Sequence, residues 1–306
     1  MSVSPGRGKN TEEEGPRRRS DYPRATAVAP DPRLRPYICA YRFFELDAAR
    51  AYTVPAWTRH MMLFRYGEFF YAYFPDGTAV PHLGASFFGP TTRPLAYGGA
   101  TGRYRFVAAE FRPLVMASIL RERVDGLTDR VVEADAVLRR GETVWVTDAL
   151  SAAPDDAQRV RVLDSLFLQL FSRRSIEIPP KLAAALSVVW SGGCFGYMPE
   201  LIARTGYSER TLRRRFRTAT GLSPRQYHVV LRAERALSAL YYRPELGLDD
   251  VAHYAGYSDQ SHLIHHMRRL TGMTPGALRG EPCAGVAPLR DFFRPASGRT
   301  IQYNSA

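Results

Sequence analysis

Four arginines with helical spacing are the residues of this chain that point most directly to a chemistry. Arg210, Arg213, Arg214 and Arg217 fall at positions i, i+3, i+4 and i+7, so they would share one face of an α-helix. Guanidinium groups this close repel one another unless an anion lies in front of them, and Glu209 is the one acid beside them. This face predicts binding to DNA phosphates and bases, with a solvated basic surface as the alternative.

The opposite face of the same segment is apolar and fixes how the helix must pack. Leu212 and Phe216 are at i and i+4, so they should face a core. Ser208 suits the N-cap of this helix, and Gly206 can adopt the positive φ of a sharp break before it. Because a shorter helix starting near Pro199 precedes the break, the pattern predicts a helix-turn-helix unit, whose second helix enters the major groove.

A second copy of the pattern occupies residues 246–275, after the first at 196–224. Here we expect Asp249 and Ser258 to cap the two helices. Leu263 and Met267 should face the core, as Leu212 and Phe216 do in the first copy. Together the two copies predict these DNA-binding residues: Ser208, Arg210, Arg213, Arg214, Arg217, Gln260, Ser261, Ile264, His265 and Arg268. Ile264 suits a thymine methyl group and Gln260 an adenine edge.

Net charge agrees with a nucleic-acid partner. Residues 180–280 contain 14 Lys and Arg against 7 Asp and Glu, and the whole chain carries a net charge of +12. Positive charge attracts the phosphate backbone whatever the base sequence.

Residues 180–280 resemble the two-motif DNA-binding domain of the AraC family of bacterial transcription regulators. The first motif contributes Ile-Ala at 202–203, Gly-Tyr-Ser at 206–208, Thr-Leu-Arg-Arg-Arg-Phe at 211–216 and Thr-Gly-Leu-Ser-Pro at 220–224; the second contributes Val-Ala at 251–252, Gly-Tyr-Ser-Asp-Gln-Ser-His-Leu at 256–263 and Leu-Thr-Gly-Met-Thr-Pro at 270–275. The resemblance implies seven helices, with a long linker helix over residues 224–242, and double-stranded DNA and RNA polymerase as partners. The chain departs from the family at His265, where Arg is usual, and at Met267, where Phe is usual.

The remaining sequence predicts an α+β protein. We expect a disordered tail over residues 1–30, a cupin-like sensor or dimerisation domain over 31–175, the double helix-turn-helix domain over 180–280, and a second tail over 281–306. Strands are expected at 63–66, 69–74, 86–89 and 103–112, with a turn at 75–78 and helices at 113–121 and 155–171.

The strand-rich half resembles the cupin-like sensor domains of many AraC-family proteins, a β-barrel or sandwich with helices. The resemblance to one subgroup is carried by residues 88–94, 110–113 and 127–132. It identifies no effector-binding residues. Eight aromatic side chains of this region would either line a ligand pocket or form its core: Trp57, Phe64, Tyr66, Phe70, Tyr71, Tyr73, Phe87 and Phe88.

No catalytic or metal-binding pattern stands out, so we expect no enzymatic activity, no cofactor and no metal. His60 and His82 are isolated, and the helical pair His262 and His266 lacks a glutamate between them. The scattered cysteines Cys39, Cys194 and Cys283 argue against a disulfide framework, and no run of 18 or more apolar residues occurs. We therefore expect a cytoplasmic protein without a membrane partner.

The sequence thus predicts a sequence-specific transcription regulator. Its first domain should bind a small effector or form a homodimer. Two alternatives stay open: a DNA-repair methyl-acceptor protein, which would need an activated thiol such as that of Cys39, and an architectural DNA binder without a ligand.

Overall fold

Two antiparallel sheets make up the first part of the chain. The computed structural model describes residues 24–47, 52–67, 71–73, 79–81, 84–98, 103–120, 123–191 and 197–279. The larger sheet has the order β1 (Arg24–Val28), β2 (Ile38–Asp47), β9 (Arg103–Phe111), β4 (His60–Arg65), β7 (Ala85–Phe88) and β10 (Val131–Glu133). The smaller sheet has the order β3 (Tyr52–Val54), β8 (Leu95–Gly98), β5 (Tyr71–Tyr73) and β6 (Ala79–Pro81).

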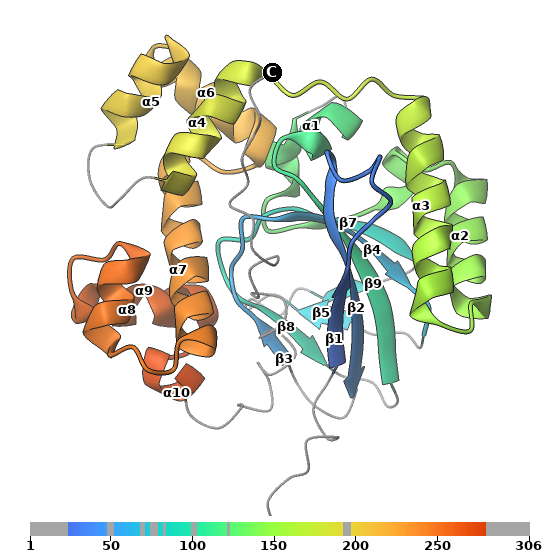
Figure 1. Ribbon diagram of the computed structural model, residues 1–306, viewed down its shortest axis with the longest axis horizontal. Helices are drawn as coiled ribbons and strands as arrows, with labels where there is room; N and C mark the ends of the chain where they lie inside the picture. Colours follow the sequence, from blue (N-terminus) through green and yellow to red (C-terminus); the bar gives the residue numbers. More distant parts are fainter. Residues whose placement is uncertain are drawn as a thin grey trace, which may run out of the picture.

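Alternating side chains give the larger sheet two apolar faces. Along β9, Val107 and Phe111 belong to one core and Tyr104 and Phe106 to another. The first core is covered by α2 (Arg140–Ala152) and α3 (Asp156–Ser172), whose Phe167 ring meets that of Phe111 edge to face at 5.6 Å. Figure 1 shows these two helices along one side of the larger sheet. The result is a pair of antiparallel sheets with covering helices, as the predicted fold class requires.

Most of the aromatic residues considered for a pocket belong to the core. Trp57, Phe64, Phe87 and Phe88 are at most 1% exposed, and Tyr66 is also buried. Phe70 and the turn predicted at 75–78 lie outside the described residues. The described aromatic side chains therefore hold the sandwich together.

The strands and helices expected in this part correspond to β4, β5, β7, β9, α1 (Val115–Leu120) and α3. Most of the two predicted tails lies outside the described residues, but Arg24–Val28 forms β1 and pairs with β2. This short edge strand depends on backbone pairing with a distant segment, which local composition does not show.

Among the described residues after position 179, seven helices follow, the number that the resemblance implies for this part. They are α4 (Pro180–Ser191), α5 (Tyr197–Thr205), α6 (Glu209–Thr220), α7 (Pro224–Tyr242), α8 (Leu248–Ala255), α9 (Gln260–Thr271) and α10 (Pro275–Arg279). The linker helix α7 has the predicted bounds: Pro224 occupies its first turn, and Ser223 caps it by accepting from the Gln226 amide. None of the helices in the described ranges is long and apolar enough to cross a bilayer.

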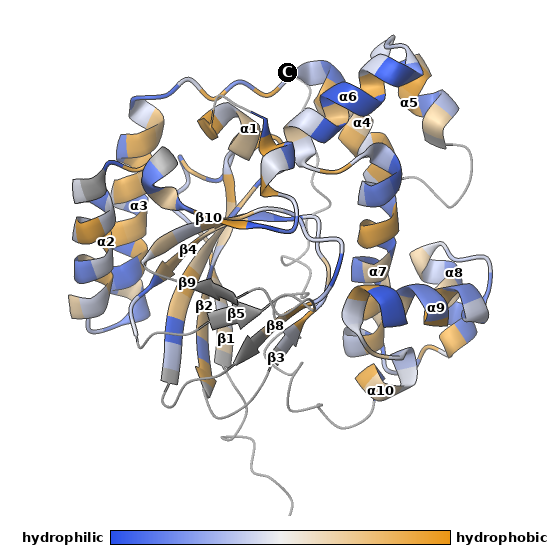
Figure 2. Ribbon diagram, turned by 180° about the vertical axis from the view of Figure 1, so that it is seen from behind, coloured by the Kyte–Doolittle hydropathy of each residue, from blue (hydrophilic) through white to orange (hydrophobic). Residues whose placement is uncertain are grey.

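The β-rich part and the helical part share a continuous apolar core. The inner side chains of the sandwich join those of α4–α10 in one cluster. Hydrogen bonds cross the boundary at three places: the Ala56 amide donates to the Leu270 carbonyl at 2.7 Å, the Thr58 amide and hydroxyl donate to the Glu234 carboxylate at 2.6 and 3.3 Å, and the Thr128 hydroxyl donates to the Gly221 carbonyl at 2.6 Å. Figure 2 shows the helical part standing beside the sheets.

Gly221 lies at this boundary, close to Pro90 and Thr128 of the β-rich part. It ends α6 with a φ of +84°, and a Cβ there would come within 2.8 Å of Pro90 and 2.9 Å of Thr128. Gly272 ends α9 in the same way with φ +75°, but a Cβ there would meet nothing within 4 Å. Comparing substitutions at Gly221 and Gly272 therefore separates the cost of left-handed backbone strain from the cost of a steric clash across the boundary.

We expect Gly221→Ala to destabilise the protein by about 1 kcal/mol more than Gly272→Ala, because only the first adds a clash to the left-handed strain. Urea unfolding of the two variants measures the difference. Equal free energies of unfolding for both variants would show that the residues around Gly221 accommodate a Cβ without loss of stability.

Candidate nucleic-acid interface

The first helix-turn-helix unit is formed by α5 and α6. Gly206 forms the turn between the two helices with a φ of +63°, and Ser208 caps α6 by accepting a hydrogen bond from the Thr211 amide. Leu212 and Phe216 are fully buried, and the Phe216 ring meets Tyr227 of α7 edge to face at 5.5 Å. These contacts fix the rotation of α6 about its own axis.

With that rotation fixed, the four predicted arginines are exposed on α6. Arg213 forms an ion pair with Glu209 one turn earlier, while Arg210 and Arg214 have no ion pair within the described residues. Arg217 lies with its Nε 3.9 Å from Asp125, in the short helix η2 (Val124–Leu127) of the β-rich part. The exposed face of α6 therefore presents four guanidinium groups, and the last of them, that of Arg217, already faces the carboxylate of Asp125.

Arg215 lies outside the predicted set, and the structure gives it another partner. Its guanidinium carbon lies 5.0 Å from the centre of the Tyr207 ring. It therefore stacks on the turn of its own unit.

The second unit is formed by α8 and α9. Gly256 separates them with φ +84°, and Leu263 and Met267 are fully buried, as predicted. The predicted caps were wrong. Gly247 occupies the N-cap of α8 and donates its amide to Asp250, so Asp249 is not the cap.

At α9 the cap is Asp259, whose carboxylate accepts from the His262 amide at 2.8 Å. Ser258, the predicted cap, instead donates its hydroxyl to Asp259 at 2.8 Å. The helix starts one residue later than in the first unit, because a carboxylate one position further along satisfies the free amides.

On the outer side of α9, Ser261, His265 and Arg268 are exposed, and Gln260 and Ile264 are half-buried. His262 and His266 lie on a neighbouring side. Their ring centres are 4.4 Å apart, and both rings contact Tyr257. The five predicted contact residues thus share one side of the helix, and the histidine pair faces inward toward α7.

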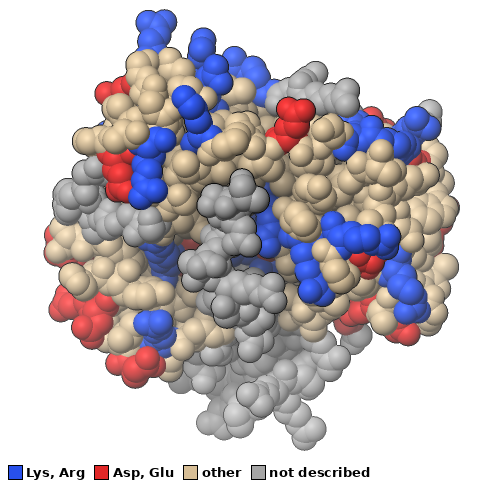
Figure 3. Space-filling view, turned by 45° about the horizontal axis from the view of Figure 1, so that its top comes forward, with Lys and Arg blue, Asp and Glu red and all other residues tan. Residues whose placement is uncertain are grey.

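The two exposed helices lie at opposite ends of α7 (Figure 1). The 19 residues of α7 span about 28 Å at 1.5 Å per residue. Figure 3 shows Lys and Arg side chains projecting along the upper edge of the molecule, over α4–α6. This arrangement suits contacts with two successive stretches of major groove.

Known proteins with similar sequences agree with this geometry. A family described as a helix-turn-helix domain matches residues 201–281, which contain both units. The HTH-type transcriptional activator RhaR of Pectobacterium atrosepticum is 28% identical over 166 residues, which cover 52% of each protein. The RhaR protein of Pectobacterium carotovorum matches to the same extent. Residues 201–281 therefore carry a helix-turn-helix domain of the AraC type. The chain spans about half the length of these curated relatives.

Solved structures with a similar arrangement include unsaturated fatty acid-bound ToxT from Vibrio cholerae. That protein is 11% identical, with a TM-score of 0.49 over 78% of this chain and 94% of its own. The DNA-binding domain of AdpA, solved with a target DNA, is 32% identical, with a TM-score of 0.31 over 32% of this chain and 89% of its own.

The β-rich part reaches α6 through Asp125. Its carboxylate pairs with Arg123 at 2.6 Å as well as facing Arg217. The hydrogen bond from Arg123, and more weakly the charge of Arg217, lower the pKa of Asp125. No local pattern could have predicted the contact between Asp125 and Arg217, because the two residues are far apart in the chain.

The residues considered for metal binding or catalysis do not assemble within the described part of the chain. His60 is buried, which lowers its pKa to about 4, and no group of three potential metal ligands occurs among the described residues. His82, Cys194 and Cys283 lie outside those residues. Burial, and then the charge of Glu110, raise the pKa of the Cys39 thiol to about 12, which makes it a poor nucleophile at neutral pH.

Proposed function

We propose that this chain binds DNA sequence-specifically and regulates transcription, with α6 and α9 as its two reading helices. The observation that carries the proposal is the packing of Leu212, Phe216, Leu263 and Met267, which turns both predicted contact faces outward. The residues proposed to contact DNA are those predicted from the sequence on α6 and α9.

We further propose that the β-rich part and the helical part have separate roles. Residues 31–175 act as a sensor or dimerisation domain and residues 180–280 as the DNA-binding domain, without catalysis. RNA polymerase is the proposed partner of the DNA-bound protein, in the cytoplasm. The hydrogen bonds and the shared core across the boundary support this coupling, because a change in one part alters the packing of the other.

Genome-wide mapping of bound DNA, followed by footprinting of a recovered site, tests the proposal. We expect protection of two major-groove segments on one face of the duplex, about 34 Å apart. An architectural binder would instead protect DNA without a common sequence. Mass spectrometry after incubation with methylated DNA tests the methyl-acceptor alternative, which requires a methyl group on a cysteine.

Asp125 provides a test of the coupling between the two parts. Asp125→Asn should strengthen binding to all DNA by up to about fivefold, because it frees Arg217 and removes a negative charge beside the proposed phosphate contacts. A partly exposed ion pair of this kind contributes at most about 1 kcal/mol. Fluorescence anisotropy with specific and random duplexes measures the effect.

Glu133→Gln is the matched control, since it removes one exposed carboxylate from β10 of the same part. If both variants bind DNA with equal affinity, Asp125 acts only through net charge. The contact with Arg217 would then have no regulatory meaning.

A further inference from the structure

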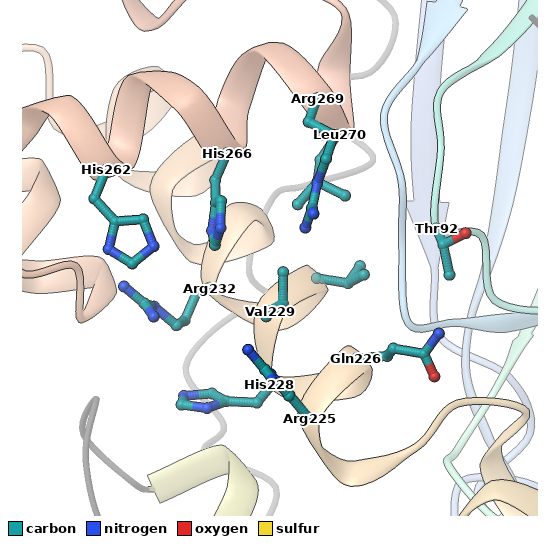
Figure 4. A pocket seen from close by; sticks show the side chains of 11 residues that line it. Thr92, Arg225, Gln226, His228, Val229, Arg232, His262, His266, Arg269 and Leu270 are labelled. Atoms are coloured by element: carbon teal, nitrogen blue, oxygen red, sulfur yellow. The ribbon is translucent and has the colours of Figure 1, made fainter.

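A cavity of about 600 Å³ lies between α7, α9 and Thr92 of the β-rich part (Figure 4). Its lining consists of Thr92, Arg225, Gln226, His228, Val229, Val230, Arg232, His262, His266, Arg269 and Leu270. Three of these side chains are arginines and three are histidines, and none is acidic. So many cationic and imidazole groups without an acid among them favour an anion as the occupant.

Arg232 is the group in this cavity that most needs a partner. Its side chain extends from α7 toward His262 of α9 and is only 7% exposed. Nε and Nη2 of Arg232 make no hydrogen bond within the described part of the chain, although its guanidinium stacks over Tyr257 at 3.9 Å. A buried guanidinium with unused donors is unfavourable unless a ligand satisfies it.

The histidines face the same space. Nδ1 of His266 is buried without a hydrogen-bond partner in the described residues. Burial, together with nearby His262, Arg269 and Arg232, lowers the pKa of His266 to about 4, and burial with Arg232 does the same for His228. Both rings are therefore neutral at physiological pH, so the arginines supply the positive charge and the imidazoles supply hydrogen bonds.

We propose that this cavity binds a small, multiply charged oxyanion, of the class of phosphorylated or polycarboxylated metabolites. Arg225, Arg232 and Arg269 pair with its anionic groups. Val229, Val230 and Leu270 contact its carbon skeleton. The role of this ligand as an effector rests on the proposed function. Its binding to the cavity does not depend on that function.

The position of the cavity gives the ligand a direct route to the DNA-binding face. His262, His266 and Arg269 alternate along α9 with the proposed contact residues Ile264, His265 and Arg268. A ligand that bridges α7 and α9 fixes the second reading helix relative to the linker helix. The ligand thereby sets the distance and orientation of α9 relative to α6.

Isothermal titration calorimetry of the full chain without DNA tests the inference, with inorganic pyrophosphate and citrate as probes at constant ionic strength. We expect saturable binding of at least one probe with a stoichiometry of one. Arg269→Ala and Arg232→Gln should each weaken that binding at least tenfold. The side chain of Arg269 is exposed, so its removal leaves the core intact even if Arg232→Gln impairs folding.

Arg243→Ala is the control, because Arg243 follows the end of α7, is exposed and stacks on Tyr254 away from the cavity. It should leave probe binding unchanged. The absence of saturable binding for both probes, or equal binding by Arg269→Ala and the unchanged chain, would overturn the inference.

A DNA phosphate offers the same chemistry, and a second titration separates the two sources. A site for a free anion keeps its affinity for the probe when the reading helices are saturated with duplex. Loss of probe binding under duplex, together with a salt dependence of DNA binding reduced by about one ion in Arg269→Ala, would assign the cavity to the DNA backbone instead. Probe binding by a chain that proves not to recognise DNA would sustain the site and refute only the proposed function.

Discussion

Glu110→Ala is expected to lower the free energy of unfolding by about 3–5 kcal/mol, because it removes the buried carboxylate that pairs with Arg42 and Arg59. Glu110 accepts from Arg42 Nε at 2.6 Å inside the sandwich, and Arg59 lies 3.4 Å from the same oxygen. Both Glu110 and Arg42 are more than nine-tenths buried. Urea unfolding of the variant measures the loss.

The same carboxylate should make stability depend on pH. Burial alone would raise its pKa, but the charges of Arg42 and Arg59 and the hydrogen bond outweigh burial, so the pKa of Glu110 is lowered. A carboxyl group whose pKa is lowered by folding stabilises the fold above its unfolded pKa, and this contribution is lost as pH falls through the folded value. Glu110→Ala should therefore have a flatter stability profile on the acidic side.

Glu200→Ala is the control, because the Glu200–Arg204 pair on α5 is exposed, with 51% and 61% of the two side chains accessible. Its removal should change stability little. Similar losses for the two variants would mean that burial does not determine the strength of the Glu110 contacts.

Arg213→Ala combined with Arg214→Ala is expected to abolish operator recognition while retaining weak binding to any DNA. A bidentate arginine contact with guanine contributes roughly 1–3 kcal/mol, so two such contacts contribute on the order of 2–6 kcal/mol. Arg214 has no ion pair in the described residues, whereas Arg213 must first leave Glu209. Of the two single variants, Arg214→Ala should therefore lose more specificity. Binding to operator and random duplexes over a range of salt concentrations measures each contribution.

Arg217→Ala should behave differently, since Arg217 lies at the C-terminal end of the face, where a phosphate contact is expected. Its loss should weaken binding to all duplexes alike and reduce the salt slope by about one. Arg204→Ala, on the preceding helix, should change neither quantity. Small and equal losses on operator and random DNA for Arg210→Ala, Arg213→Ala and Arg214→Ala would disprove the assignment of base contacts to α6.

The helical part could be predicted closely because its pattern is local. Apolar spacing, the capping Ser208 and a glycine at each break placed α6 and α9 within a residue or two of their observed bounds, and the family resemblance placed α7. The caps of α8 and α9 were missed for a local reason too. Asp249 and Asp250 are adjacent, as are Ser258 and Asp259, and all four are good capping residues, so composition alone does not choose between neighbours.

The features that could not be predicted all join distant segments. Thr58 and Glu234 are separated by 176 positions, and Thr128 and Gly221 by 93. The ion pair of Arg42 and Glu110 joins two strands whose neighbour relation depends on the order of the whole sheet. The cavity between α7 and α9 was missed because its arginines and histidines are ordinary helix residues until two helices bring them together.

The shared boundary limits how freely this chain can be recombined with its relatives. A chimera that joins α4–α10 to another sensor must provide new donors for three acceptors on the helical side: the carboxylate of Glu234 and the carbonyls of Leu270 and Gly221. It must also accommodate Gly221, where the β-rich part approaches the backbone too closely for a side chain. Segments 54–58, 90–92 and 127–129 should therefore be transplanted together with the helices. A chimera joined only at the segment between α3 and α4 would separate residues that pack in one hydrophobic core.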